Sequence, residues 1–440
     1  MNTLRRRLLA ASVAAIASGA GYIGWMRRAQ REPAIVQAPL APDPLFPNPL
    51  HVPGKAELNG IADVAAAFTL VGTSVQHEIL RGKPTTMLAY ALEHHGRTLI
   101  NPLLRAQTGA NLRVRYWNAL DEISIVHWHG LKNDTNNDGH PHYAVGPGAT
   151  YDYQFTVANR AGTYWYHPHP HHLAGKQTYL GLAGLFVVED HEELALERAL
   201  DLELGVTDIP LLIQDRSFAA DGSLAYAPGA REHFHGYCGD TVLMNLTANA
   251  CLNCDTRLYR FRLVNGSNAR VYRLAFMQQE HALDFDVIGG DGGLLEKPQR
   301  ASELFLSPGE RADVLVDLRA AAVGERIILA SLPFDAMQMA SRRTADTREP
   351  ALNGTPLELM LIRVIRQIRF DRAIPETLTH PAVFTAEHAG TRLFKIDQVR
   401  GVWRINGGTY RMTETAFAVK RGTREVWEFR NPAPGMQHPI

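Results

Sequence analysis

Three copies of one strand pattern, spaced a domain's length apart, constrain the fold of this chain more than any other feature. The copies are TGANLRVRYWNA (108–119), DTRLYRFRLVNG (255–266) and RGTREVWEFRNP (421–432). Each begins as a turn, continues as an alternating strand with arginine and aromatic residues, and ends on an asparagine that opens the next loop. The asparagines, Asn118, Asn265 and Asn431, are 147 and 166 residues apart, which is a domain-sized period. The repeat predicts three similar domains in series.

Short β-type runs between turn residues indicate that these domains are built from strands. Runs such as Tyr151–Val157 and Ala312–Leu318 alternate or are rich in β-branched residues, and Gly, Pro, Asn and Asp bound them. One short stretch, His191–Leu200, has a helical pattern. The chain is therefore predicted to be all-β, with sandwiches or barrels as its domains.

The repeat also sets the expected boundaries. We expect sandwiches over 54–195, 196–366 and 367–440, preceded by a proline-rich linker over 31–53. After Asn118 the first domain continues to Val188, whereas nine residues follow Asn431. The third domain is therefore expected to be incomplete within these 440 residues, with strands missing and sheet edges unpaired.

Residues 1–30 have the pattern of a targeting segment. Arg5-Arg6-Arg7 precedes an uncharged stretch from Leu8 to Trp25, which is typical of an export signal of the twin-arginine type. The alternative is an uncleaved anchor, with Trp25 at the membrane interface. Both alternatives predict that the folded part lies outside the cytoplasm, in the periplasm or another extracytoplasmic compartment, and the second adds a membrane tether.

Charge and cysteine content limit which binding partners and which disulfides the chain can have. The 45 basic and 45 acidic residues cancel, so no nucleic-acid partner is predicted, and we expect a monomer. Three cysteines, Cys238, Cys251 and Cys254, permit one disulfide in an oxidising compartment, and the pairing stays open. Cys251 and Cys254 could form half of a zinc site, but no second cysteine pair completes it.

Two histidine clusters in the first domain carry the chemistry. HWHG (127–130) follows the first repeat strand, and WYHPHPHH (165–172) comes later in the same domain. On a strand, the two imidazoles of an H-x-H pair lie on one face about 6.6 Å apart. Two such pairs on neighbouring strands could converge as four nitrogen ligands, and a donor set without carboxylate or thiolate favours copper or zinc.

These motifs resemble a known family. HWHGLKNDTNNDG and GTYWYHPHPHHLAGKQTYLGLAGLFVVED are similar to the first cupredoxin domain of multicopper oxidases. IPLLIQDRSFAADG (209–222), YRFRLVNGSNAR (259–270), DGGLLEKP and LSPGERADVLVD resemble the second domain of bacterial copper-efflux and bilirubin-oxidase-like members. The resemblance implies tandem cupredoxin-like Greek-key β-sandwiches, the third incomplete, and copper as the cofactor.

The resemblance also implies roles for single residues. His127 matches the type 2 copper ligand, and the type 3 ligands are matched by His129, His167 and His169. Asp138 matches an acidic residue that handles protons near the type 2 site, with a turn former in Asn-Asp-Gly as the alternative reading. His171 and His172 match no ligand.

The family's third-domain motifs are only partly present. His438-Pro439 falls where the family has His-Pro-x-His-x-His, whose first histidine binds type 1 copper, and the later His-Cys-His stretch is absent. Cys238, in HFHGYCGD, lies in the middle domain and cannot replace it. The sequence therefore holds four of the eight histidines of the family's trinuclear cluster. We expect no oxidase turnover from these 440 residues alone.

The resemblance implies one-electron oxidation of a phenolic, pigment or metal-ion substrate, coupled to reduction of dioxygen to water. Efflux-type members, which oxidise metal ions, often have a methionine-rich insert in the third domain, whereas here only Met337 and Met339 stand close together. The alternative function is a non-catalytic copper-binding protein or periplasmic scaffold with the same architecture. Four imidazoles at ligand spacing argue against a scaffold.

Overall fold

The computed structural model describes residues 41–54, 56–335, 353–381 and 390–431. The chain divides into two units, Met1–Pro42 and Asp43–Ile440, and every element below belongs to the second unit. The targeting segment over 1–30, the Met337/Met339 pair and His438 lie outside the described residues. Within the described ranges, no helix is long and apolar enough to cross a membrane.

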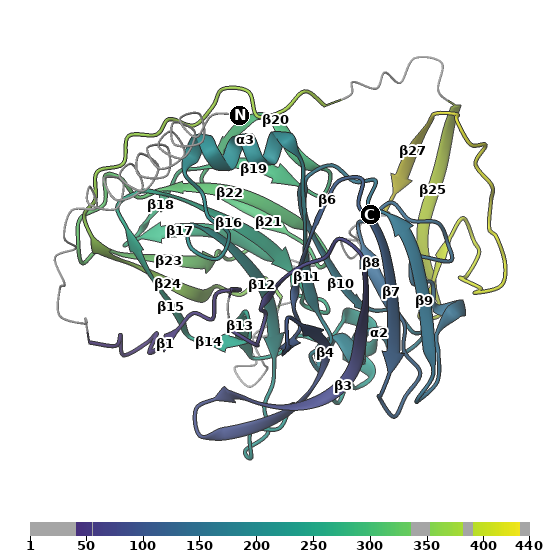
Figure 1. The fold of residues 1–440 in the computed structure, drawn as a ribbon. Coiled ribbons are helices and arrows are strands. Elements are labelled where there is room, and N and C mark those ends of the chain that lie inside the picture. The colour runs from purple at the N-terminus through teal and green to yellow at the C-terminus, as the bar shows by residue number, and fades with distance from the viewer. Residues whose placement is uncertain (1–40, 55, 336–352, 382–389, 432–440) are drawn as a thin grey trace, which may run out of the picture. The chain divides into compact units, whose positions relative to one another are not determined.

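The first sandwich consists of two five-stranded sheets (Figure 1). One sheet has the order β5 (Arg97–Ile100), β4 (Lys83–His94), β3 (Ala67–Leu80), β7 (Asn111–Asn118) and β9 (Thr150–Thr156). The other has the order β2 (Ile61–Asp63), β6 (Leu103–Gln107), β11 (Gly184–Glu189), β10 (Gly162–Pro168) and β8 (Val126–His129). Buried and exposed residues alternate strictly along the first repeat strand, β7, because one face of it packs on the core and the other meets solvent.

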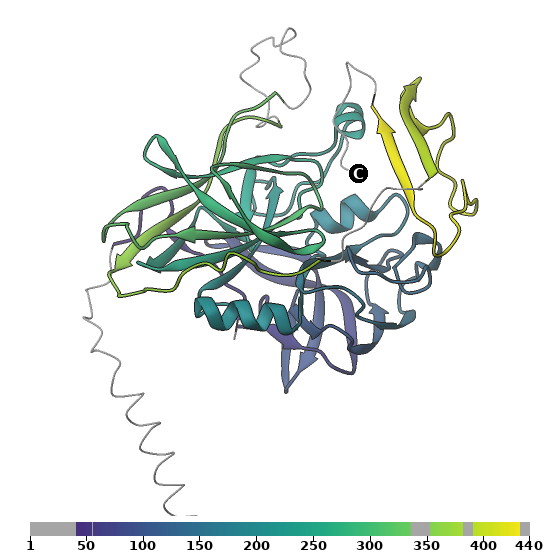
Figure 2. The same cartoon turned by 90° about the horizontal axis from the view of Figure 1, so that it is seen from above.

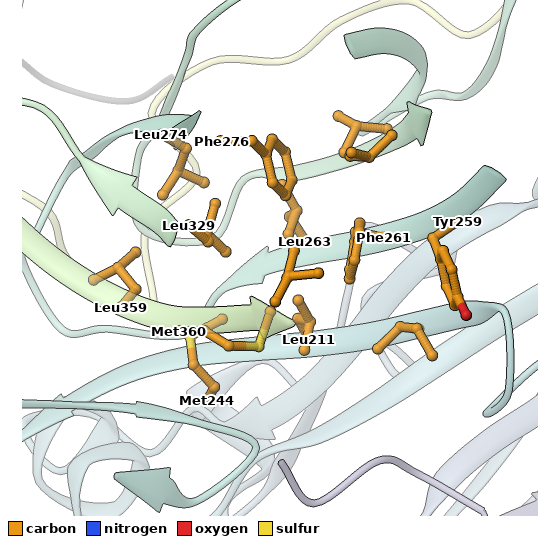
Figure 3. Close-up of a cluster of buried hydrophobic side chains, with 14 of the residues drawn as sticks. Leu211, Met244, Tyr259, Phe261, Leu263, Leu274, Phe276, Leu329, Leu359 and Met360 are labelled. Atoms are coloured by element: carbon orange, nitrogen blue, oxygen red, sulfur yellow. The ribbon is translucent and has the colours of Figure 1, made fainter. Parts of the chain in front are cut away.

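The second sandwich consists of two seven-stranded sheets. The first sheet has β14 (Thr247–Ala248), β13 (Thr241–Met244), β12 (Asp208–Arg216), β16 (Leu258–Asn265), β22 (Arg311–Asp317), β19 (Phe285–Gly290) and β20 (Gly293–Ala301). The second has β1 (Asn48–Pro49), β15 (Ala250–Asp255), β24 (Leu357–Arg366), β23 (Arg326–Ser331), β17 (Tyr272–Gln278) and β18 (His281–Leu283), with β21 (Leu304–Leu306) also paired to β17. Leu211, Phe261 and Leu263 from one sheet meet Phe276, Leu329 and Met360 from the other in the core (Figure 3). Strands therefore form both sandwiches, and the all-β prediction is confirmed.

Helices are short in the described residues. The predicted one, α3 (His191–Leu200), begins at Asp190, whose side chain accepts bonds from the backbone N–H groups of Glu192 and Glu193; this is a good N-cap. Three further helical turns had no signal in the sequence: α2 (Ala174–Tyr179), the 3-10 turn η1 (Pro141–Tyr143) and α4 (Ala230–His235). These have six residues or fewer, too few for a periodic apolar pattern.

The second repeat strand, β16, is buried on both faces. Its Arg260 and Arg262 are fully buried and face carboxylates from three elements. Arg262 Nη2 lies 2.6 Å from Glu193 of α3 and 2.7 Å from Asp208 of β12, and Arg260 Nη2 lies 2.7 Å from Asp313 of β22. Thr163 of β10 donates to the Asp313 carboxylate over 2.7 Å. This buried ionic network joins the two sandwiches and the helix between them.

Two segments from outside the expected range of the second domain bind the second sandwich. Residues 48–49, within the expected linker, form β1, which pairs in parallel with β15. Beyond Arg366, within the range expected for the third domain, Leu378 N–H donates to Glu296 O over 2.9 Å and Thr379 donates to Glu192 over 2.6 Å. Residues near the expected boundary at 366 therefore bind the second sandwich as extended chain.

The third repeat strand, β27 (Glu425–Arg430), pairs in parallel with β25 (Gly390–Val399), which pairs with β26 (Val402–Ile405). Figures 1 and 2 show β25 and β27 side by side in yellow. Large apolar side chains on these strands are exposed, namely Val399, Val402, Trp403, Ile405, Val426, Trp427 and Phe429. Among the described residues, this sheet has three strands.

Candidate metal centre

The antiparallel pairing of β8 and β10 brings the two histidine motifs together. His127 is opposite His167, and His129 is opposite Trp165. Because side chains alternate across a strand, Trp128, between His127 and His129, and its partner Tyr166, next to His167, point the other way: both are fully buried in the core of the first sandwich. The predicted H-x-H spacing therefore puts the imidazoles on one face of the sheet.

The four imidazoles lie close together. The ring centroid of His127 is 5.5 Å from that of His129, 5.2 Å from that of His167 and 5.3 Å from that of His169. One nitrogen from each of His127, His129 and His167 lies within 4.8 Å of the others. The structure therefore brings together all four histidines that the sequence analysis singled out in this domain.

Backbone carbonyls hold two of the rings by their Nδ1 atoms. His127 Nδ1 lies 2.6 Å from Asp138 O, and His167 Nδ1 lies 3.0 Å from Pro168 O. A carbonyl oxygen only accepts, so each Nδ1 carries the proton and each Nε2 keeps its lone pair. His129 Nδ1 lies 3.1 Å from His167 Nε2, which is hydrogen-bond distance. The two rings therefore face each other directly.

The surroundings keep three of the imidazoles, those of His129, His167 and His169, neutral. Burial, with help from the Arg311 guanidinium and from neighbouring histidines, lowers the pKa of His129 to about 3. Burial and the rings of His127 and His129 hold the pKa of His167 well below its ordinary value. The pKa of His169 is also lowered, by burial and then by His127. Neutral imidazole is the form that binds a metal.

Asp138 lies beside His127, as the sequence analysis expected of a residue near this ligand. Its carboxylate Oδ2 is 3.6 Å from His127 Nδ1, while its backbone oxygen accepts the shorter bond to the same atom. The carboxylate is 40% exposed and therefore open to solvent. Two groups of Asp138 thus lie near His127 Nδ1, and the sequence indicated only the carboxylate.

The remaining sequence candidates lie elsewhere. His171 and His172 are exposed, and their rings contact each other at a centroid distance of 3.8 Å. Cys238, Cys251 and Cys254 are all free, so the disulfide that the sequence permitted is not formed among them. Cys254 is buried in the core of the second sandwich. His438 lies outside the described residues.

Two neighbours of the cluster went unassigned in the sequence analysis. Trp165 stacks on His129 at a centroid distance of 5.1 Å, and its ring is 4.3 Å from that of His167. Gly309, from the second sandwich, lies directly against the His129 ring. Both were within quoted motifs, but their contacts depend on strand register and on the docking of the two domains, which a sequence motif does not encode.

The cluster fits a copper ion by its chemistry. It offers four imidazoles, and in two of them a carbonyl binds Nδ1, so that Nε2 is the nitrogen that faces the cluster. Anchoring of the second ring nitrogen is the arrangement that orients histidine ligands in metal sites. Imidazole donors without thiolate suit copper and zinc.

Comparison with known proteins identifies the family. The multicopper oxidase family matches residues 78–193 and again 245–349. The multicopper oxidase mco of Staphylococcus aureus is 34% identical over 377 residues, which cover 85% of this chain and 73% of that protein. The cell division protein FtsP of Sodalis glossinidius is 28% identical over 341 residues, covering 77% of this chain and 68% of that protein.

Solved structures agree with the sequence relatives. The crystal structure of the McoA multicopper oxidase from Aquifex aeolicus superposes with a TM-score of 0.74 at 38% identity, covering 82% of this chain and 74% of that one. The resemblance stated from the histidine motifs is thereby confirmed, and so is the expected cupredoxin fold. This chain belongs to the multicopper oxidase family of copper-dependent oxidoreductases.

Proposed function

We propose that His127, His129, His167 and His169 are copper ligands, with His127 at the type 2 site and the other three at the type 3 pair. The observation that supports this most is the convergence of the four rings, from β8, β10 and the residue after β10, with the ring centroid of His127 within 5.5 Å of each of the others. Copper would supply one-electron chemistry: oxidation of a phenolic, pigment or metal-ion substrate and reduction of dioxygen to water.

The protein's own groups orient the ligands and move protons. The carbonyls of Asp138 and Pro168 hold the Nδ1 protons of His127 and His167, which directs both Nε2 atoms away from the backbone. Water formation consumes protons. The half-exposed Asp138 carboxylate, 3.6 Å from His127, can take a proton from solvent and release it at the site.

The oxidase reaction needs groups that residues 1–440 do not contain. A blue copper site uses two histidines and a cysteine, and His438 is the one residue here that matches the family's type 1 ligands. Cys238 has a pKa raised to about 12, mainly by burial, so it does not offer a thiolate. We therefore propose that the 440-residue chain binds copper without turnover, and that turnover needs the rest of a third domain.

The alternative is a non-catalytic protein of the same architecture. The similarity to a cell division protein supports this alternative. The anchored, neutral imidazoles favour the oxidase, because a scaffold has no need of four converging metal ligands. We further propose an exported, monomeric protein. Its N-terminal segment would act as a signal or as a membrane tether.

Oxygen consumption tests the oxidase proposal. Two versions are expressed, one ending at Ile440 and one continued through the remaining third-domain residues of a relative, and both are loaded with copper. With a phenolic donor, we expect oxygen uptake and blue absorption from the longer version alone. A longer version that binds copper and stays inactive would favour the scaffold. Turnover by the 440-residue version would contradict the role given to the third domain.

A further inference from the structure

Gly309 of the second sandwich lies against the ring of His129 in the first. A Cβ atom on Gly309 would be 2.8 Å from His129 Cε1 and 3.3 Å from its Nε2. Real Cβ atoms essentially never come within 3.0 Å of another heavy atom in this way, so only glycine leaves room for the imidazole. Gly309 also has φ +87°, a left-handed conformation that glycine adopts without strain.

The turn that carries Gly309 is held rigidly. It connects β21 to β22, and Gly309 N–H donates to Asn265 O over 2.8 Å. Its own carbonyl accepts from Arg311 Nη1 over 3.0 Å. Glu310 N–H donates to Ser307 O over 3.0 Å and closes the turn. The surface met by the His129 ring is therefore fixed backbone rather than an adaptable side chain.

Arg311 links this turn to the first sandwich. Its Nε donates to Thr163 O of β10 over 3.2 Å, and its Nη1 lies 2.9 Å from the Asp291 carboxylate. The guanidinium lies over Gly130, where a Cβ would come 2.5 Å from Nη2. Gly130 has φ +86° and follows His129 directly. Each sandwich thus contributes one glycine with a positive φ at this contact. Gly309 leaves room for the His129 ring, and Gly130 leaves room for the Arg311 guanidinium.

We propose that Gly309 is a positioning residue for the metal centre: the second sandwich presses its backbone against His129 and so sets the orientation of that ring. This inference rests on the proposed copper function. It assigns the second domain a part in the site, although all four clustered histidines belong to the first. Trp165, His167 and His127 also contact the ring, so the imidazole has little freedom to turn.

The test compares Gly309→Ala with Gly324→Ala in the 440-residue chain. Gly324 has φ +91° and open space where its Cβ would be, so both variants impose the same backbone strain and only one meets His129. In metal-free protein, the Cε1–H resonance of His129, identified by its loss in His129→Ala, should shift in Gly309→Ala and stay in place in Gly324→Ala. Copper affinity should fall about tenfold or more in Gly309→Ala alone.

Equal behaviour of the two variants would overturn the inference. If the unaltered chain takes up no copper, the proposed function fails, while the metal-free resonance still decides the positioning role. Should Gly309→Ala fail to fold, Arg311→Lys decides instead, because lysine keeps the charge and loses the bonds that hold the turn on β10. We expect it to shift the same resonance and weaken copper binding about threefold or more; an unmoved resonance would refute the proposal.

Discussion

At the scale of single residues, histidine spacing predicted the face of the sheet and missed what fixes each ring. The H-x-H rule requires only strand alternation, and it correctly grouped His127 with His129. The partners of the Nδ1 atoms are backbone carbonyls of Asp138 and Pro168. Any residue type offers a carbonyl, so the sequence carries no signal for these contacts.

Tyr153 supports the strand that carries the first histidine motif. Its hydroxyl accepts from Val126 N–H over 2.9 Å and donates to Val126 O over 2.8 Å, and both bonds are buried. Tyr153→Phe leaves two buried backbone groups without a partner, and we expect a loss of about 1–3 kcal/mol in the free energy of unfolding. Tyr151→Phe is the control, since its hydroxyl bond to Asn136 O is exposed. Denaturant unfolding that gives equal losses for both would contradict this account.

At the scale of elements, the repeat predicted the strands but not the burial of their charges. Arg115 of β7 is exposed and pairs with Asp152 on the surface, whereas Arg260 and Arg262 of β16 are fully buried. The two strands have the same pattern in sequence. They differ because β10 and α3 cover the second one, and such coverage follows from domain docking, which local periodicity does not report.

Removing one charge from the buried network should destabilise the protein strongly. Although burial alone would raise it, the two guanidinium groups hold the pKa of Glu193 down, at about 2. Glu193→Gln removes the carboxylate that the two buried guanidinium groups share and leaves them only Asp208 and Asp313, and we expect a loss of about 3–5 kcal/mol in the free energy of unfolding. Asp152→Asn removes the exposed partner of Arg115 and should cost about 1 kcal/mol or less. Comparable losses of the two variants in denaturant titrations would show that the buried ionic network does not stabilise the protein more than a surface ion pair does.

Glu197 of α3 should make stability depend on pH. Burial, followed by the nearby Glu193 and Glu189 carboxylates, raises its pKa from 4.5 to about 7. The folded state therefore holds a proton on Glu197 that the unfolded chain loses near pH 4.5. The contribution of this proton to the free energy of unfolding is complete below pH 4.5 and is lost as pH rises through 7. Glu197→Gln mimics the protonated form and should gain stability relative to the unaltered protein between pH 4.5 and pH 8.

The control for this pH dependence is Glu203→Gln, at an exposed position. Its stability difference from the unaltered protein should stay constant between the two pH values. Chemical unfolding at both pH values gives the measurement. If the difference in free energy of unfolding between Glu197→Gln and the unaltered protein also did not change with pH, Glu197 would titrate alike in the folded and unfolded chain.

At the scale of the whole molecule, the sequence predicted the class of fold and the face on which the four histidines gather, and missed how separate segments dock. Strand alternation and turn residues predicted an all-β chain with sandwiches. Residues 48–49 and the segment around Leu378 attach to the second sandwich through a few backbone bonds. These segments have no apolar period, so their docking leaves no pattern to detect. The expected boundaries, 54–195, 196–366 and 367–440, remain predictions.

Copper retention tests most directly whether the four clustered histidines bind copper. The 440-residue chain is loaded with copper, dialysed and analysed for metal content and for nitrogen hyperfine structure in its electron paramagnetic resonance spectrum. Its variants are a quadruple alanine substitution of His127, His129, His167 and His169, and a control with His171→Ala and His172→Ala. We predict that the unaltered chain and the control retain copper with nitrogen ligation, and that the quadruple variant loses it. A quadruple variant that stays folded and holds as much copper as the unaltered chain would contradict the account.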